Sequence, residues 1–542
     1  MGRRDVFFLT AIVAGGATLT AGLTRPAIPT QRPTPIASTS IDEEDPNDPR
    51  VVASRVDEAL AADWSDMGLR PTPIAHELTL MRRLSLALTG SVPSLEDIRK
   101  FEARPAVDRL DSWLADLLAD RRAADYLAER WTRVFVGTED GPFLLFRRRR
   151  FRTWLSDQLF TNRPYDAIVK DLIADRGIWT DHPATNFVSV TYDMDSQRPD
   201  AERLAARTAR AFLGVRLDCA QCHDHPFQPW KQADFRGLAA FFGGIHSDLR
   251  GVRDGESTYH PKDRKTDEPQ DVEPTVPFLG ELLAESGGPR DRLAAWVVDP
   301  KNKSLGRATA NRVWALMFGR PLVEPVDDLP ASGDVPAALE VLAADFRSHG
   351  HDLRRLITVI AATETFRRDS GDEDRGDEPS TEHETNWVAF PITPLRPEQV
   401  AGSIFQAASV RTLAADSHWL VRLAVYNGRN DFVRRYGDVG EDSFDVHAST
   451  IPQRLLLMNG QIVRDKIKSD LFNATSLIAT LAPTDRKAVE VAYLAVLTRR
   501  PTPEELDHFA AKLEGTTGQT RKDLLTDLYW ILFNSTEFSW GH

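Results

Sequence analysis

The two cysteines of this 542-residue chain lie three positions apart and directly precede a histidine, in the stretch DCAQCHDHPFQPW. Cys219, Cys222 and His223 have the spacing C-x-x-C-H, which is typical of covalent haem attachment in exported proteins. Two thiols one helical turn apart can add across the two vinyl groups of a haem, and His223 then lies under the iron as an axial ligand. The spacing therefore predicts a covalent haem c with Cys219 and Cys222 as thioether anchors.

Two other uses of the same residues stay open. An exported protein with two nearby cysteines usually oxidises them to a disulfide. Alternatively, a zinc or iron ion would find sulfur and nitrogen ligands in Cys219, Cys222, His223 and His225, although four ligands within seven residues demand a very tight loop. A thioredoxin-like redox pair fits less well, because the motif follows a helical pattern and not a strand.

The remaining candidate ligands are less well defined. On a helix, His225 would point about 200° away from His223, and Pro226 disfavours helical backbone at the residue before it. We therefore expect His225 to be a turn residue and not a haem ligand. The sixth iron ligand is not identified; His246 and Met317 are the candidates, because His and Met are the usual partners of such iron.

The amino terminus has the layout of an export signal. Arg3 and Arg4 precede an uncharged stretch, so residues 1–23 are predicted to be a signal peptide, or a membrane anchor if the segment is not cleaved. Residues 24–50 contain six prolines and an acidic cluster, which predict a disordered tether. We expect an extracytoplasmic protein, in the periplasm or at the cell surface.

Beyond the tether, apolar residues recur at helical spacing and strand-like alternation is scarce. The predicted fold class is mainly α, with two helical domains. The first domain covers residues 51–248 and contains the C-x-x-C-H motif; a charged linker at 249–276 separates it from the second domain at 277–542. An acidic insert at 370–385 interrupts the second domain and is expected to be disordered.

Two local patterns predict where helices begin and what they deliver. Ser94 followed by Asp97 is a variant of the capping box, which marks a helix start. The segment AERLAARTARAFLGVRLD has apolar residues on one face, so a helix over residues 201–218 can bring Cys219 to its place.

The charge balance argues against nucleic acid as a partner. The net charge of −13, from 67 Lys and Arg against 80 Asp and Glu, gives a surface that repels phosphate backbones. The basic run at Arg147 to Arg150 is expected to form a solvated face or internal ion pairs. Motifs of nucleotide-binding proteins, serine hydrolases and zinc metalloproteases are absent from the sequence.

Several long stretches carry a family resemblance. RLDCAQCHDHPFQPWKQADFRGLAAFF, together with LTLMRRLSLALTGSVPSLEDI and NRPYDAIVKDLIADRG, resembles the domain of unknown function numbered fifteen-forty-nine of planctomycete cytochrome-like proteins. The second half resembles its usual companion, numbered fifteen-fifty-three, through RATANRVWALMFGRPLVEPVDDLPASGD and the terminal WILFNSTEF. The resemblance implies a cytochrome-associated exported protein, with a neighbouring exported protein as redox partner by analogy.

This sequence departs from the family pattern near one candidate ligand. The family often has histidine where this chain has Leu316, so a ligand role on this helix would pass to the neighbouring Met317. Arg312 in the same motif either reaches a haem propionate or pairs with an acid such as Asp327 or Asp328.

The predicted function is that of a c-type haem protein that transfers single electrons outside the cytoplasm. Two other classes of protein stay open. One is an enzyme that uses haem or a metal, such as a peroxidase, an oxidase or an enzyme acting on polymer breakdown products. The other is a cell-surface binding or structural protein whose two cysteines form a disulfide.

Overall fold

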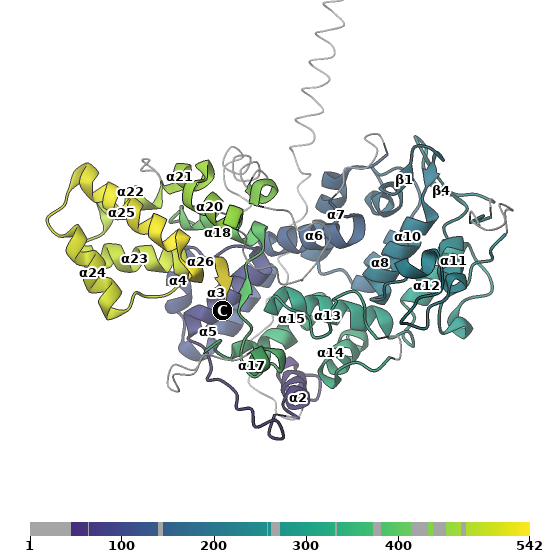
Figure 1. Ribbon diagram of the computed structural model, residues 1–542, viewed down its shortest axis with the longest axis horizontal. Coiled ribbons are helices and arrows are strands. Elements are labelled where there is room, and N and C mark those ends of the chain that lie inside the picture. Colours follow the sequence, from purple (N-terminus) through teal and green to yellow (C-terminus); the bar gives the residue numbers. More distant parts are fainter. Residues whose placement is uncertain are drawn as a thin grey trace, which may run out of the picture. The chain divides into compact units, whose positions relative to one another are not determined.

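The structure is a computed structural model in which most of the described chain is helical (Figure 1). It describes residues 45–62, 64–138, 145–256, 258–261, 271–330, 333–371, 381–413, 432–436, 451–467 and 473–542. The strands within these ranges are short and pair in twos, so the predicted mainly α class is confirmed. The predicted signal and most of the tether lie outside the described residues. No helix within the described ranges is long and apolar enough to cross a membrane.

The first half of the chain forms helices and two β-hairpins, and it contains the motif. Its helices are α2 (Pro49–Ala61), α3 (Glu77–Thr89), α4 (Leu95–Glu102), α5 (Arg109–Ala119), α6 (Arg121–Val136), α7 (Arg148–Phe160), α8 (Tyr165–Ala174), α9 (Asn186–Ser189), α10 (Ala201–Thr208) and α11 (Gln232–Ala240). Strand β1 (Tyr192–Asp193) pairs antiparallel with β2 (Arg198–Pro199), and β3 (Ile245–Asp248) pairs with β4 (Gly251–Asp254).

The second half is a longer series of helices. They are α12 (Pro289–Val297), α13 (Ser304–Phe318), α14 (Ala337–Ser348), α15 (Leu353–Ala362), α16 (Glu364–Arg367), α17 (Thr381–Thr385), α18 (Pro397–Ala407), α20 (Ile451–Asn459), α21 (Gln461–Ile467), α22 (Ala474–Leu481), α23 (Asp485–Leu497), α24 (Pro503–Leu513), α25 (Gly518–Asn534) and α26 (Thr536–Ser539). Strand β5 (Thr393–Pro394) pairs antiparallel with β6 (Trp540–Gly541), next to the end of the chain.

Local sequence signals explain several helix starts. The Ser94 hydroxyl accepts the Asp97 backbone N–H, and the Asp97 carboxylate accepts the Ser94 N–H, so the predicted capping box at α4 is confirmed. Thr502 and Glu505 form the same reciprocal pair at α24, where Pro503 occupies the first helical turn.

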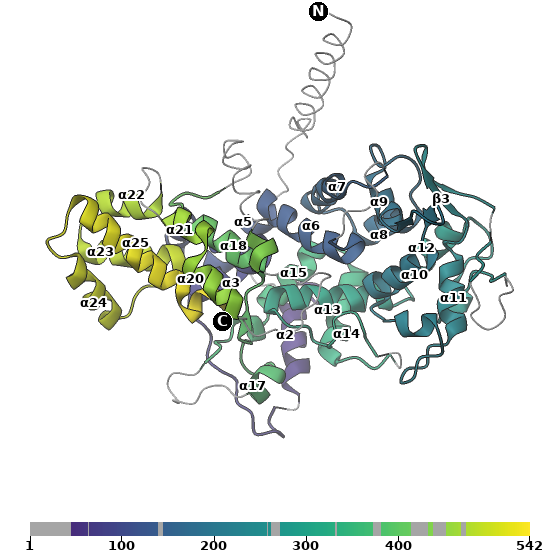
Figure 2. The ribbon, with the colours of Figure 1, turned by 45° about the horizontal axis from the view of Figure 1, so that its top comes forward.

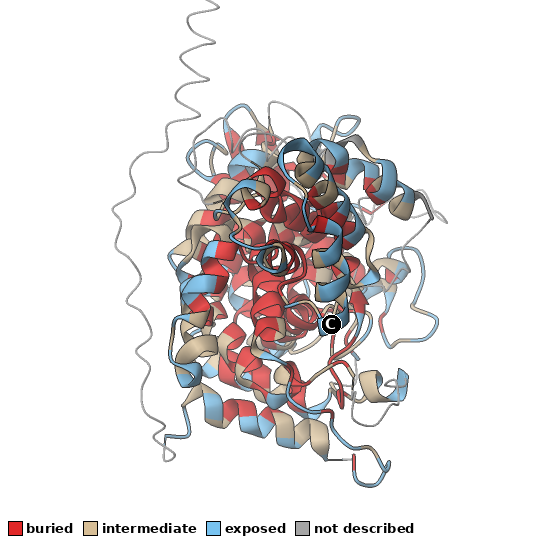
Figure 3. Cartoon of the chain, turned by 90° about the vertical axis from the view of Figure 1, so that its left-hand side faces the viewer, coloured by how far each residue is buried: buried red, intermediate tan, exposed pale blue. Residues whose placement is uncertain are grey.

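Helices of the two predicted domains share one hydrophobic core. Figure 3 shows the buried residues gathered in the interior. Helix α3 of the first half packs against α5, α6 and α13, and α2 packs against α14 and α15 of the second half. Figures 1 and 2 show α3, α13 and α15 between the helices α22–α25 and the helices α10–α12. The described residues from 45 to 542 accordingly form one compact unit.

Two buried arginines of α3 bind backbone carbonyl groups that come from the second half of the chain. Arg82 donates to the carbonyls of Val496 and Phe538 at 3.1 and 3.3 Å. Arg83 donates to three more carbonyls, and its guanidinium lies 3.7 Å from the centre of the Phe390 ring. The carbonyl acceptors of Arg83 are those of Phe366, Arg368 and His542, at 3.0, 2.6 and 2.7 Å. Burial lowers the pKa of Arg83 to about 9, so the side chain stays charged at neutral pH.

A buried ion pair joins α6 to α18. Glu398 accepts a hydrogen bond from Arg130 at 2.8 Å, and Arg396 lies 3.3 Å from the same carboxylate. Burial opposes the ionisation of Glu398, but the charges of Arg130, Arg396 and Arg133 outweigh it and hold its pKa at about 2. The carboxylate is therefore ionised over the whole physiological pH range.

Three segments that the sequence left as loops or charged runs have definite structure in part. The predicted linker at 249–276 contains β4, and a bridge between Tyr259 and Val272 follows. Residues 372–380 of the acidic insert lie outside the described residues, and its end forms α17. In the basic run, Arg148 binds Glu129 at 3.0 Å, so this residue makes an internal ion pair.

We predict that Arg83→Met destabilises the fold strongly, because three buried carbonyl groups lose a charged donor. The expected loss is about 3 to 5 kcal/mol in the free energy of unfolding, measured by urea denaturation. The exposed Arg55 on α2 is the control, and Arg55→Met is expected to change the same quantity by less than about 0.5 kcal/mol. Equal effects of the two substitutions would contradict the role given to Arg83.

Candidate functional site

The C-x-x-C-H motif follows a helix, which ends before the last residues of the segment 201–218 that the sequence predicts to be helical. Helix α10 continues into a π-helical turn at Ala209–Leu213 and ends at Gly214, whose φ of +65° suits a residue without a side chain. The Gly214 carbonyl accepts the Leu329 N–H at 2.6 Å. The face predicted to be apolar is buried at Leu204, Thr208, Ala211, Phe212 and Val215.

The two thiols and the histidine of the motif lie at the surface, in a short 3-10 turn and the two residues that follow it. The turn covers Asp218–Gln221, with Cys219 inside it and Cys222 directly after it. Both cysteines are exposed and free, and His223 is exposed as well. Ala220 between them is fully buried and fixes the turn to the core.

The His223 ring is oriented by a backbone carbonyl. Its Nδ1 lies 2.7 Å from the carbonyl oxygen of Asp224. A carbonyl oxygen can only accept, so Nδ1 carries the proton and the neutral ring has its lone pair on Nε2. This is the arrangement that a metal-ligating histidine usually has, with one nitrogen donating to a carbonyl and the other free to ligate.

Residues of the first half of the chain form hydrogen bonds with the motif and with the residues that follow it. The Glu202 carboxylate accepts hydrogen bonds from the side chains of Gln221, at 2.6 Å, and Tyr259, at 2.7 Å. Gln232 donates its backbone N–H to the Asp224 carboxylate and its side-chain amide to the Gln221 carbonyl. Burial and the bond to Glu202 raise the pKa of Tyr259. Sequence analysis did not identify Glu202 or Tyr259, because they are separated by 57 residues and belong to no motif.

Two acidic residues of the second half bind the segment around the motif. Asp328 accepts the Arg216 backbone N–H at 3.2 Å and the Gln228 side-chain amide at 3.2 to 3.3 Å. Asp327 binds the Arg216 guanidinium at 2.7 Å. The sequence suggested these acids as partners of Arg312, but the structure brings them to residues on both sides of the motif.

Arg312 lies on α13 and is buried against the end of the helix that leads to the motif. Its guanidinium donates to the Ala211 carbonyl at 3.3 Å and lies 5.6 Å from the centre of the Trp131 ring. Ala211 belongs to the π-helical turn, whose wider winding makes its carbonyls available to outside donors. Arg312 therefore supports the approach to the motif from α13, and at 2% exposure its side chain lies in the core.

The ring of His225, the fourth ligand of the alternative metal site, accepts hydrogen bonds within its own turn. Its Nδ1 accepts the backbone N–H groups of Phe227 and Gln228 at 3.2 and 3.0 Å. The proton of the neutral ring is then on Nε2, so no lone pair is left for a metal ion. His225 is thus the turn residue that Pro226 predicts. In the part of the chain that the structure describes, no three His, Cys, Asp or Glu side chains converge to hold a metal ion.

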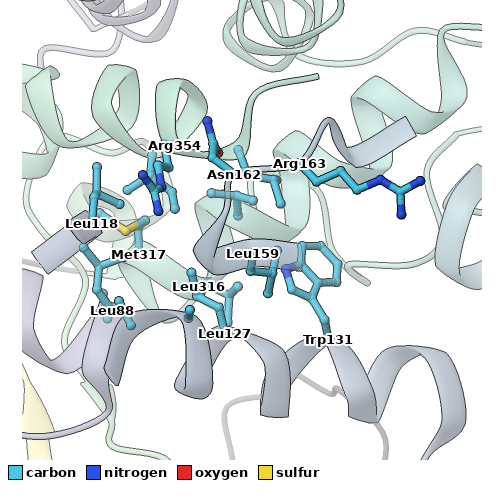
Figure 4. Close-up of a pocket in the computed structure, with 16 residues that line it drawn as sticks. Leu88, Leu118, Leu127, Trp131, Leu159, Asn162, Arg163, Leu316, Met317 and Arg354 are labelled. Carbon is cyan, nitrogen blue, oxygen red and sulfur yellow. The ribbon is translucent and has the colours of Figure 1, made fainter. Parts of the chain in front are cut away.

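The structure does not bring the two candidate sixth ligands to the motif. Met317 is buried on α13 and lines an apolar cavity of about 30 Å³ between helices of both halves, beside Leu88 and Leu118 (Figure 4). Leu316 lines the same cavity. His246 lies on β3 with its ring against Gly255, where a Cβ would come within 2.7 Å of the ring.

Comparison with known families identifies the class of both halves. Residues 55–247 match the family PSCyt2, described as a protein of unknown function (DUF1549), and residues 289–418 match PSD1, described as a protein of unknown function (DUF1553). The two halves therefore match the two domains that the sequence resemblance predicts, in the same order. Comparisons with curated proteins and with solved structures gave no match.

The contacts of the motif fit a covalently attached haem. Both thiols of Cys219 and Cys222 are free and accessible, which thioether formation requires. The Nδ1 proton of His223 is held by the Asp224 carbonyl, so Nε2 is the nitrogen that would bind iron.

We predict that Asp328→Ala loosens the segment around the motif without unfolding the protein. The segment would lose the acceptor of two hydrogen bonds, which together contribute about 1 to 3 kcal/mol. Backbone amides of residues 216–230 should exchange with deuterium roughly tenfold faster, measured by mass spectrometry. Asp66→Ala, at an exposed position on another segment, should leave these rates unchanged. Unchanged exchange in Asp328→Ala would contradict the contact.

Proposed function

We propose that the protein is an extracytoplasmic haem c protein that transfers single electrons. Cys219 and Cys222 are the thioether anchors and His223 is the axial ligand. The proposal is supported by one observation above all. The His223 ring presents Nε2 beside two free thiols, because the Asp224 carbonyl holds the proton on Nδ1. The name of the PSCyt2 family is consistent with an association with cytochromes.

Each residue around the motif has a defined part in this proposal. A haem bound here supplies one-electron redox chemistry near the protein surface. The Asp224 carbonyl fixes the orientation of the His223 ring. Glu202 binds the side chain of Gln221, between the two thiols, and Asp328 binds Arg216 and Gln228 on either side of them, so the spacing of the thiols is set before attachment. A partner protein outside the cytoplasm would exchange the electron, and the arginine-led N-terminal segment would export the chain or anchor it to a membrane.

We predict that the exported protein carries a covalent haem when it is produced in a host with haem-attachment machinery. The alkaline pyridine spectrum of the reduced, denatured protein should show the band of a c-type haem. The double substitution Cys219→Ala with Cys222→Ala should abolish the band. His225→Ala is the matched control and should keep it, because His225 uses its Nδ1 to close the turn at Phe227 and Gln228.

The outcomes of this experiment separate the classes of function. A haem whose reduced form binds carbon monoxide has an open sixth position, which favours an enzyme such as a peroxidase. Absence of the band, while a control cytochrome matures in the same host, would contradict the haem proposal. Free thiol counting on that haem-free protein would then show whether Cys219 and Cys222 form a disulfide.

A further inference from the structure

A large apolar side chain is held in solvent four residues after the motif histidine. Phe227 is 92% exposed, more than any other large apolar residue among those described. Single exposed apolar side chains are common on protein surfaces, so the exposure of Phe227 gains meaning only from its place beside the motif and from how firmly the backbone holds the ring in solvent. The contacts of the turn at residues 225–230 show how the backbone is held.

The turn that carries Phe227 is closed by hydrogen bonds. His225 donates its backbone N–H to the Trp230 carbonyl at 2.8 Å, and its ring accepts the N–H groups of Phe227 and Gln228. The Trp230 indole N–H donates to the Gln228 side chain at 2.7 Å. Pro226 and Pro229 restrict the backbone further, because proline fixes its own φ near −65°.

The same turn is fastened to the core on two sides. Trp230 is buried and its ring lies 6.2 Å from that of Phe278. Gln228 donates its side-chain amide to Asp328 of the second half. The backbone at Phe227 is therefore anchored on both sides, and mobility does not explain its exposure. A rigid turn that presents a phenyl ring to solvent fits a surface that is completed by a bound apolar group.

We propose that the Phe227 ring packs against the haem attached at Cys219 and Cys222. This inference rests on the proposed function, since it names haem as the occupant. Haem is the apolar group that the adjacent thiols and His223 would place beside this turn. By covering part of the porphyrin, Phe227 limits the access of water to the haem and so raises its reduction potential. Phe227 then contacts the haem itself and needs no contact with an electron-transfer partner.

The test uses the exported protein, first shown to contain haem by its pyridine spectrum, with phenylalanine replaced by fluorophenylalanine. The fluorine resonance of Phe227 is assigned by its loss in Phe227→Leu. In the haem-containing protein we expect this resonance to be shifted and broadened compared with the haem-free variant Cys219→Ala with Cys222→Ala. Phe227→Ala should lower the reduction potential and leave the thermal midpoint unchanged. Leu249→Ala, at a 73% exposed position in the turn between β3 and β4, should change neither quantity.

The possible results distinguish the inference from the function on which it rests. Haem in the wild-type protein with an unshifted Phe227 resonance and an unchanged potential in Phe227→Ala would overturn the packing of Phe227 and leave the haem function standing. Absence of haem in the wild-type protein would overturn both. A resonance that shifts only when another exported protein is added would also overturn the inference, because Phe227 would then contact that protein.

Discussion

The fold depends on two guanidinium groups buried on α3. Arg82 and Arg83 bind carbonyl groups from α23, from the segments around Phe366 and Phe538, and from His542. A buried charge of this kind is tolerated only where carbonyl or carboxylate oxygens surround it, so every segment that supplies an oxygen must be in place together. This requirement explains why the regions matched by two family models form one compact unit with a shared core.

The same dependence extends to the motif. Helix α13 and the residues after it contact the segment that leads to and follows the thiols through four residues, Arg312, Asp327, Asp328 and Leu329. The first domain therefore contains the reactive residues, while the second domain fixes the backbone that presents them. A function built on Cys219, Cys222 and His223 would require both domains, which gives a physical reason for their occurrence in one chain.

The features that could be predicted from sequence are those encoded within a few residues. The capping box at Ser94, the apolar face before the motif and the turn at His225 depend on neighbours in the chain, and the structure confirms each of them. The contact between Gln228 and Asp328 spans 100 residues, and that between Arg83 and His542 spans 459. No spacing rule links such residues, because tertiary packing alone brings them together. The exposure of Phe227 could not be predicted either, since an aromatic residue between prolines is equally compatible with the core.

The central claim is that the thiols of the motif carry a haem. The mass of the tryptic peptide that contains both thiols tests this claim most directly. The protein would be purified after export from a host that attaches haem, reduced, digested with trypsin and analysed by mass spectrometry. The account predicts that the peptide containing Cys219 and Cys222 is heavier by the mass of one haem. The same peptide with two unmodified thiols, from a preparation in which a control cytochrome is fully loaded, would contradict it.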